Sequence, residues 1–222
     1  ERLQTAASMV SDGYTLADVG TDHGYVPLCL CGQKRIQRAI AMDVNQGPLE
    51  RAKAHIREAG MEGQIETRLS DGLTALRAGE ADTILIAGMG GPLTIRILRE
   101  GAHALSGVKE LILQPQSDLP HFRHFLAGIG WEITDEEMIK EDGKFYPMMK
   151  AVRNRKSQKI TYTEEEAWFG PLLLKKCHPV LKEYLLREAS IRKKIIAGLS
   201  GAPSASAKDR LGEVKEEMAL IE

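Results

Sequence analysis

Three acidic residues come at or next to the ends of successive short apolar runs in the first third of the sequence. They are Asp18, Asp43 and Asp71, and the runs span residues 15–19, 39–43 and 65–69. If these runs are parallel strands, their carboxyl ends meet at the edge of the sheet where open α/β folds bind ligands. We therefore expect the three carboxylates to line one ligand site and to favour a positively charged ligand.

Residues 18–24, Asp-Val-Gly-Thr-Asp-His-Gly, join a predicted strand to a predicted helix. Glycine lets a ligand approach the backbone, and the first turn of a helix presents free N–H groups. The segment lacks the G-x-G-x-x-G pattern of dinucleotide sites, because Asp22 stands where a second glycine would lie under a pyrophosphate. Its carboxylate would repel that anion, whereas the sulfonium and ammonium of S-adenosylmethionine would gain Asp18 and Asp22 as partners. The competing interpretation is a polar turn with a helix cap.

Asp43 lies nineteen positions after Gly24, close to the offset of about 20 residues at which nucleoside sites carry the acid that binds the ribose hydroxyls. Asp71 and Gly72, just beyond the third run, are placed to hydrogen-bond an adenine amino group. Taken alone, Asp43 is weak evidence, and Asp71 is equally consistent with an ordinary turn. Together with the first loop, both favour a nucleoside site.

Residues 88–91, Gly-Met-Gly-Gly, are expected in the loop after a fourth strand at 83–87. Bare backbone there would let a flat base or a methyl donor lie close. Many base methyltransferases carry Asn-Pro-Pro-Tyr or a similar tetrad at this place, and its absence argues against the usual methylation of an amino group. Gln114-Pro115-Gln116, after a fifth strand at 111–113, can offer amide groups to a base edge or simply end the strand.

These strands alternate with single helices, which predicts parallel pairing with helices on both faces of the sheet. The expected helices span 2–10 and 48–59, and two more begin near Pro27 and Pro92. Alternating runs at 131–139 and 144–152, joined by Glu-Asp-Gly, then predict a hairpin. Five parallel strands with a terminal antiparallel hairpin is the layout of the class I methyltransferase fold, a Rossmann-like α/β fold. Dinucleotide dehydrogenases usually end on a further parallel strand.

The remaining residues, 153–222, show a helical pattern and are expected to form a separate domain after residues 1–152. Apolar residues at three-and-four spacing mark two amphipathic helices, and a Gly/Pro/Ser loop at 198–204 separates them. We expect an antiparallel, coiled-coil-like hairpin that buries Leu and Ile between its helices. The apolar positions are Leu181, Tyr184, Ile191, Ile195 and Leu199 in the first helix and Leu211, Val214, Met218 and Ile221 in the second.

Charge divides the chain in the same way. Residues 1–152 carry 16 Lys and Arg against 21 Asp and Glu, whereas residues 153–222 carry 14 against 10. The basic clusters of the second part can bind phosphates of a nucleic acid, and the competing interpretation is a solvated helix surface. Their residues are Arg153, Arg155, Lys156, Lys175, Lys176, Arg192, Lys193 and Lys194.

Composition excludes several classes of protein. No apolar run approaches the roughly 20 residues of a membrane span, and the three cysteines make neither a disulfide framework nor a zinc ligand set. His23, His121 and His124 do not indicate a metal site. We therefore expect a soluble cytoplasmic protein that holds no metal.

Several runs together resemble one known family, the bacterial tRNA (adenine(22)-N1)-methyltransferases (TrmK). They are Arg-Leu-Gln-Thr at 2–5, Ala-Asp-Val-Gly-Thr-Asp-His-Gly-Tyr-Val-Pro at 17–27, Gly-Glu-Ala-Asp at 79–82, Ile-Ala-Gly-Met-Gly-Gly at 86–91, Leu-Ile-Leu-Gln-Pro at 111–115 and Glu-Asp-Gly-Lys at 141–144. Specific motifs carry the resemblance over residues 2–152, and over 153–222 it rests on architecture only, since the family adds a helical, coiled-coil-like C-terminal domain. The family often has Ser and Ala where this chain has Thr21 and Gly24, small changes for donor binding.

The resemblance implies a class I fold, S-adenosylmethionine as methyl donor and the D-loop region of tRNA as substrate. With the arguments above, it gives a set of expected donor-binding residues around the strand ends. They are Asp18, Gly20, Thr21, Asp22, His23, Gly24, Asp43, Val44, Asp71, Gly72, Ala87, Gly88 and Met89.

Adenine N1 carries an in-plane lone pair and needs no strong base before it attacks the sulfonium methyl. The protein must then turn the base out of the tRNA and present N1 in line with the methyl group. The N1-methyladenine product is cationic, and Asp22 is the candidate catalytic residue that stabilises its forming charge, although a donor-binding role suits Asp22 equally. The alternatives are a methyltransferase acting on small molecules or proteins, and a non-catalytic RNA-binding module. Asp22 and the terminal hairpin argue against a dehydrogenase.

Overall fold

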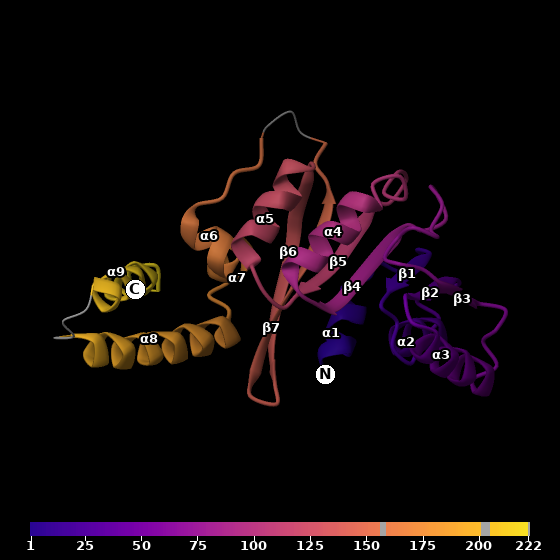
Figure 1. The fold of residues 1–222 in the computed structure, drawn as a ribbon. Helices are drawn as coiled ribbons and strands as arrows, with labels where there is room; N and C mark the ends of the chain where they lie inside the picture. Colours follow the sequence, from indigo (N-terminus) through magenta and orange to yellow (C-terminus); the bar gives the residue numbers. More distant parts are fainter. Residues whose placement is uncertain (156–158, 201–204, 222) are drawn as a thin grey trace. The chain divides into compact units, whose positions relative to one another are not determined.

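The computed structural model of the protein describes residues 1–155, 159–200 and 205–221. Contacts within the chain separate it into two compact units, Glu1–Thr161 and Tyr162–Glu222. The first unit is an α/β domain and the second is helical (Figure 1).

A seven-stranded sheet forms the centre of the first unit, with the order β3-β2-β1-β4-β5-β7-β6 (Figure 1). Strands β1 to β5 pair in parallel, and β7 pairs antiparallel to both β5 and β6. The strands are β1 (Leu16–Val19), β2 (Ala39–Asp43), β3 (Ile65–Leu69), β4 (Thr83–Met89), β5 (Glu110–Pro115), β6 (Trp131–Glu141) and β7 (Lys144–Arg153). Five parallel strands and a terminal hairpin confirm the predicted class I fold.

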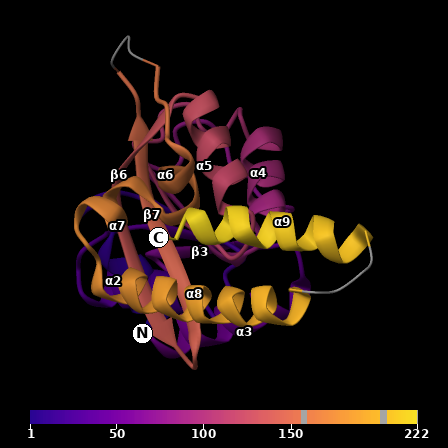
Figure 2. The ribbon, with the colours of Figure 1, turned by 90° about the vertical axis from the view of Figure 1, so that its left-hand side faces the viewer.

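Five helices belong to the described residues of the first unit: α1 (Arg2–Ser8), α2 (Tyr25–Gly32), α3 (Gln46–Glu58), α4 (Gly91–Glu100) and α5 (Leu119–Gly128). α2, α3 and α4 connect parallel strands, as the alternation in the sequence predicts, α1 precedes β1, and α5 joins β5 to β6. The connection from β3 to β4, all of which the structure describes, contains no helix. α1 contacts α2, and α4 lies beside α5 (Figures 1 and 2). Pro27 and Pro92 lie in the first turns of α2 and α4, where a missing N–H breaks no helical hydrogen bond.

One apolar cluster of the first unit lies between the sheet and helices α1 to α3. Leu16 of β1 packs in one cluster with Leu30 of α2 and Ile56 of α3, and each such side chain contributes about 1.5–3 kcal/mol when it leaves water. At the other end of the sheet, Arg123 of α5 and Glu136 of β6 are fully buried and pair at 2.9 Å. These contacts hold the strands, and with them the strand ends that carry the acidic residues.

The second unit contains four helices within its described residues. They are α6 (Glu164–Phe169), α7 (Pro171–Lys175), α8 (Pro179–Leu199) and α9 (Ala205–Ala219). α8 and α9 contact each other and run in opposite directions (Figure 2). An ion pair of 3.0 Å between Arg192 of α8 and Glu217 of α9 joins them. The predicted helical hairpin is therefore confirmed.

Its predicted apolar contacts are only partly correct. Val214 and Met218 of α9 are buried, whereas Ile191 and Ile195 of α8 are exposed. On α8 it is the side chain of Arg192 that reaches α9, and the adjacent Ile191 points in a different direction. The prediction that both isoleucines are buried between the helices is wrong.

Two strands extend beyond their predicted ends. Gly88 and Met89, expected in a loop, belong to β4, which has an irregular register between Ala87 and Met89. Gln114 and Pro115 likewise lie within β5 rather than after it. Two parts of the sequence prediction, Lys156 and the loop residues 201–204, lie outside the described residues. In the described part of the chain, no helix has the length and apolar character that crossing a membrane requires.

Candidate active site

Strands β1 and β2 end level with each other, which brings their tips together at one edge of the sheet. Val19 of β1 pairs with Met42 of β2. The amides of Gly20 and Thr21 both donate to the Met42 carbonyl, at 2.8 and 2.9 Å. Asp43, the last residue of β2, therefore lies beside the turn that begins at Gly20.

Gly20 is the residue at which β1 turns into the loop before α2. Its φ of +77° lies in the left-handed region, which costs a residue with a Cβ about 1–2 kcal/mol. A Cβ at Gly20 would also collide with Cε of Met89 on β4. Both requirements explain why glycine occupies this position, and the bare backbone leaves space for a ligand at the strand tips.

Asp18 and Asp43 are both buried, and their charges interact. Burial raises the pKa of Asp18 from its ordinary 3.8 to about 6; the nearby Thr21 side chain opposes the rise, and the charge of Asp43 adds to it. Asp43 Oδ1 accepts a hydrogen bond of 2.8 Å from the Asn45 amide. Two buried carboxylates at one edge create a negative potential that a cationic ligand would offset.

Two polar atoms of the same loop are buried without a hydrogen-bond partner in the described protein. They are Oγ1 of Thr21, whose side chain lies close enough to Asp18 to act on its pKa, and Nδ1 of His23. A buried polar group left unsatisfied costs about 1–3 kcal/mol. S-adenosylmethionine fits these groups, because it brings an ammonium and a sulfonium for the acids, ribose hydroxyls for Asp43, and a carboxylate that can accept from Thr21.

Asp22 differs from these two acids because its side chain is 60% exposed and already paired. Its Oδ1 lies 2.9 Å from Nη2 of Arg51 on α3 and 3.5 Å from Nε2 of His23. The rings of His23, Tyr25 and His55 form one cluster, with centroids 5.2 Å apart for His23 and each neighbour and 5.9 Å apart for Tyr25 and His55. The positive charge of Arg51 thus offsets part of the negative charge of Asp22, the predicted catalytic carboxylate.

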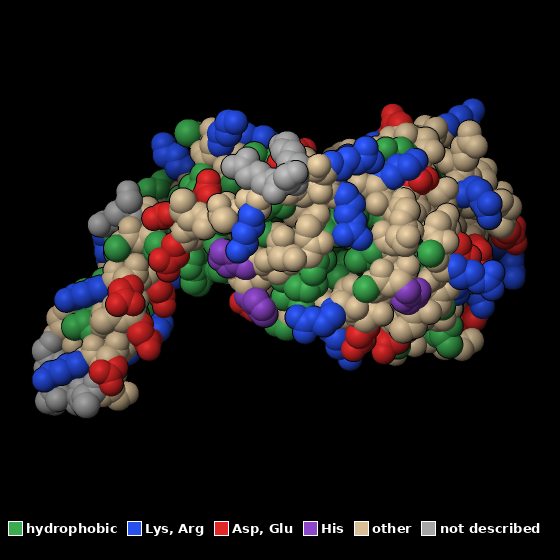
Figure 3. Space-filling model, turned by 90° about the horizontal axis from the view of Figure 1, so that it is seen from above, with side chains coloured by type: hydrophobic (Ala, Val, Ile, Leu, Met, Phe, Trp, Pro, Cys, Tyr) green, Lys and Arg blue, Asp and Glu red, His purple; other side chains and the backbone are tan. Residues whose placement is uncertain are grey.

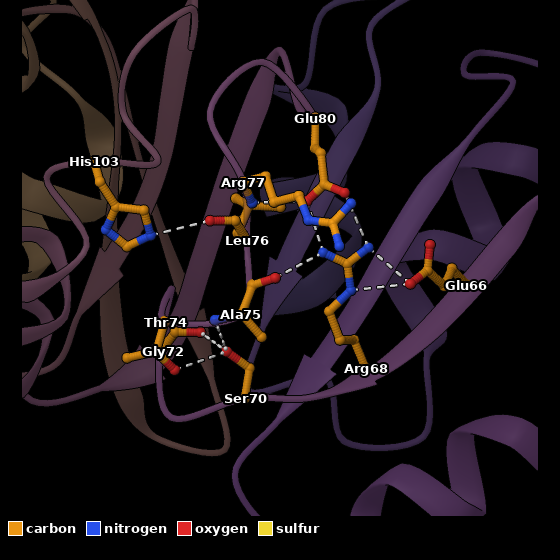
Figure 4. Close-up of polar contacts among 10 residues, drawn as sticks. All are labelled: Glu66, Arg68, Ser70, Gly72, Thr74, Ala75, Leu76, Arg77, Glu80 and His103. Carbon is orange, nitrogen blue, oxygen red and sulfur yellow. Dashed lines mark hydrogen bonds and ion pairs between the residues drawn. The ribbon is translucent and has the colours of Figure 1, made fainter.

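A hydrogen-bond network holds the loop that follows β3 (Figure 4). Ser70 Oγ donates to the Gly72 carbonyl at 2.9 Å and accepts from the Ala75 amide at 3.1 Å. Arg68 donates to the Ala75 carbonyl at 2.8 Å and pairs with Glu80 at 2.7 Å. The loop carrying Gly72 therefore has a fixed backbone rather than a freely solvated turn.

The side chain of Asp71 on this loop is exposed, and its nearest cation is Arg96 of α4 at 3.5 Å. The Ser70 amide donates to the Asp43 carbonyl at 2.9 Å, which ties this loop to the tip of β2. Val44 and Leu69, at the same edge, are 57% and 54% exposed. Apolar side chains beside a carboxylate suit a flat base that has an apolar face and an amino group on its edge.

At the end of β4, Gly88 has a φ of +80° and donates its N–H to Gln114 Oε1 at 2.9 Å. The same oxygen accepts from Arg2 Nη1 at 3.0 Å. Sequence reasoning named Gln114 but missed Arg2, which is 112 positions away along the chain. No local pattern signals such a pair, because only the parallel sheet brings α1 beside the ends of β4 and β5. Ala87 pairs with Gln114 directly beneath this contact.

The predicted basic residues fall into two groups, one in each unit. In the first unit, Arg153 ends β7, and its guanidinium lies 4.5 Å from the centroid of the Trp131 ring. Burial lowers the pKa of Arg153. Arg155 is exposed, and Lys156 lies outside the described residues.

In the second unit, Lys175, Lys176, Lys193 and Lys194 are exposed. Arg192 is different, because its side chain is 16% exposed and pairs with both Glu188 and Glu217. Two carboxylates satisfy its charge within the hairpin, which argues against a phosphate-binding role for Arg192. In Figure 3, Lys and Arg side chains of the helical unit are interspersed with Asp and Glu.

Within the residues that the structure describes, no group of three or more His, Cys, Asp or Glu side chains is arranged to hold a metal ion. The candidate site consists of strand-tip carboxylates, glycine backbone and unsatisfied polar side chains of the loop before α2.

Comparison with known proteins identifies the family of the chain. The sequence model of TrmK, described as tRNA (adenine(22)-N(1))-methyltransferase, matches residues 16–222. A protein of Bacillus subtilis (strain 168), named tRNA (adenine(22)-N(1))-methyltransferase, is 33% identical over 224 residues that cover 100% of this chain and 94% of that protein.

Solved structures show the same fold over the whole chain. The crystal structure of the B. subtilis m1A22 tRNA methyltransferase TrmK has a TM-score of 0.87 and 33% identity, covering 100% of this chain and 96% of that one. A putative tRNA (m1A22) methyltransferase of Streptococcus pneumoniae, solved in complex with S-adenosyl-L-methionine, has a TM-score of 0.84 and 34% identity, covering 98% of each chain. The chain therefore belongs to the TrmK family of tRNA (adenine(22)-N(1))-methyltransferases.

Proposed function

We propose that this methyltransferase binds S-adenosylmethionine at the tips of β1, β2 and β3 and transfers its methyl group to N1 of adenine 22 in tRNA. The observation that carries the proposal is the pair of buried, interacting carboxylates of Asp18 and Asp43 beside the glycine turn at Gly20. A site with two buried negative charges is unfavourable until a positively charged ligand enters it.

Residues at the tips of β1, β2 and β3 each bind a different part of S-adenosylmethionine. The Asp43 carboxylate accepts hydrogen bonds from the two ribose hydroxyls. The hydrogen bond that it accepts from the Asn45 amide keeps it oriented. The adenine of the donor lies against Val44, with its amino group toward Asp71. Asp18 and the Thr21 hydroxyl bind the amino-acid end, which satisfies the polar atom that is buried without a partner.

The protein's contribution to the chemical step is orientation rather than proton abstraction. The donor supplies an electrophilic methyl carbon, and adenine N1 already has a free lone pair. The target base lies at the end of β4, where Gly88 carries no side chain of its own. Holding the base and the donor in line while excluding water is worth several orders of magnitude in rate.

Asp22 keeps the electrostatic role that the sequence predicts, but in a weaker form. Its pairing with Arg51 at 2.9 Å leaves only part of its charge to act on a cationic product. Asp22→Asn, which removes this carboxylate, should therefore lower kcat. The fold change should be smaller than the fold change in S-adenosylmethionine affinity caused by removing the Asp43 carboxylate.

Exposed lysines of the helical unit contact the tRNA backbone. Lys175, Lys176, Lys193 and Lys194 are exposed, and the mixed charge of the surface predicts a modest, salt-dependent contribution. Arg153 and Arg155 extend this role to the end of the first unit. A substrate of this kind places the enzyme in the cytoplasm.

The test is methylation of an unmodified tRNA transcript by the purified protein. Mass spectrometry of the nucleosides should find N1-methyladenosine, and a transcript with guanosine at position 22 should yield none. Methylation of proteins or small metabolites with no product in tRNA would favour the alternative substrate class. Absence of heat in calorimetry with S-adenosylmethionine would contradict the donor site itself.

A further inference from the structure

The carboxamide of Gln114 is buried in an orientation that leaves half of it without a partner. Its Oε1 accepts two hydrogen bonds, from Arg2 Nη1 at 3.0 Å and from the Gly88 amide at 2.9 Å. Its Nε2 is buried and has no hydrogen-bond partner in the described protein. Rotating the amide would place its NH2 against two donors, so this orientation is the one the surroundings permit.

Gln114 lies beside Gly88 at the end of β4. A Cβ at Gly88 would lie 3.1 Å from Arg2 Nη1 and 3.9 Å from Gln116 Nε2. Donor groups from α1 and from the end of β5 therefore lie next to Gly88. A ligand that reaches this end of β4 meets N–H groups, and it gains most by presenting acceptor atoms.

The cost of this arrangement indicates a ligand. A buried donor without a partner costs free energy, and no solvent contact offsets it here. Gln114 pairs with Ala87 on β4, one residue before Gly88, so the free N–H group belongs to the same edge of the sheet as the donor site. A group of the bound substrate is the partner that this edge lacks.

We propose that Gln114 is a substrate-recognition residue whose Nε2 donates a hydrogen bond to a ring nitrogen of the target adenine other than N1. The acceptor is N3 or N7, because the exocyclic amino group of adenine is a donor and N1 must face the methyl group. Arg2 is a positioning residue that holds Oε1 and thereby aims the NH2 group. This inference rests on the proposed function, since it needs adenine at the end of β4.

The sharpest variant is Gln114→Glu. It keeps an acceptor oxygen for Arg2 and for the Gly88 amide. It replaces the free NH2 by an acceptor and adds a negative charge beside Arg2. If Gln114 only supports the structure, this change should leave activity intact. If its Nε2 donates a hydrogen bond to the substrate, activity should fall. We expect kcat/KM for tRNA to fall by about tenfold to a hundredfold, while the affinity for S-adenosylmethionine stays unchanged.

A matched control is Gln33→Glu, which introduces the same charge at an exposed residue just after α2. It should leave kcat/KM for tRNA unchanged. If Gln114→Glu also leaves kcat/KM unchanged, the proposal is overturned. If the wild-type protein itself forms no N1-methyladenosine in tRNA, the proposed function fails, and this inference fails with it.

The second arm changes the substrate and does not depend on how the variant folds. Transcripts ligated with 3-deazaadenosine or 7-deazaadenosine at position 22 lack one ring nitrogen each. One of the two analogues should lower kcat/KM of the wild-type enzyme about tenfold more than it lowers kcat/KM of Gln114→Glu. Any effect of the analogue on N1 reactivity is common to both enzymes and cancels in this comparison. Equal sensitivity of both enzymes to both analogues would overturn the proposal. The analogue that responds identifies the nitrogen.

Discussion

Replacing Asp18 by asparagine should make the protein more stable at neutral pH and less able to bind its methyl donor. Asparagine keeps the size of the side chain and an acceptor oxygen, but it removes the buried charge. Since burial is the main cause of the raised pKa of Asp18, the substitution isolates the cost of holding that charge in the folded state.

The magnitude follows from the pKa. The change from an ordinary 3.8 to about 6 corresponds to about 3 kcal/mol, at 1.36 kcal/mol per pH unit. The folded state holds the proton more tightly than the unfolded chain, so the stability that Asp18 contributes is complete below pH 3.8 and is lost as the pH rises through about 6. Asp18→Asn should therefore gain up to about 3 kcal/mol over the wild type at pH 7.5 and almost nothing at pH 4.

Urea unfolding at both pH values measures the difference. Fluorescence of the buried Trp131 reports on the first unit if Trp168, in the second unit, is replaced by phenylalanine in both proteins. Calorimetry at pH 7.5 then measures donor affinity, which should fall at least tenfold in the variant because a cation loses a buried counter-charge. A stability difference that is the same at pH 4 and pH 7.5, or an asparagine variant less stable at pH 7.5, would refute the reasoning.

Three further predictions concern the donor and tRNA sites. Asp43→Asn should weaken donor binding by at least about tenfold in calorimetry, since it removes charged hydrogen bonds to the ribose; unchanged affinity would remove Asp43 from the site. Gly20→Ala should lower the free energy of unfolding by more than about 1 kcal/mol, and adding Met89→Ala should recover only the steric part; full recovery would show that the left-handed φ costs nothing. Lys193→Glu with Lys194→Glu should weaken tRNA binding and lower its salt slope by about 2 without changing donor affinity; an unaltered slope would mean that these lysines only face solvent.

The strands of this fold are predictable because their signal is local. β2 and β3 begin and end at the predicted residues, 39–43 and 65–69. A short apolar run bounded by turn residues defines the first, and an alternating run defines the second, which lies at the sheet edge. The sequence pattern ends β4 too early, because glycine usually marks a loop, whereas Gly88 here makes an irregularity within the strand.

The partners of charged side chains are not predictable in this way, because they depend on distant parts of the chain. The sequence offers Asp22 and Arg192 as free charges, but Arg51 pairs with the first and Glu217 with the second. Each partner lies on a neighbouring helix at a distance that only tertiary packing determines. The motif at residues 18–24 therefore predicts where a ligand binds better than it predicts which charges are available to it.

The precision of the site comes from the register of the parallel strands rather than from the loops alone. Because Val19 pairs with Met42, the next residue of each strand, Gly20 and Asp43, emerges at the same level. A slip of one residue between β1 and β2 would turn Asp43 to the opposite face of the sheet. That register is held by the buried apolar side chains of the strands, such as Leu16, which have no contact with a ligand. The core thus supplies the free energy that keeps two carboxylates together at a place where, without a cationic ligand, they destabilise the fold.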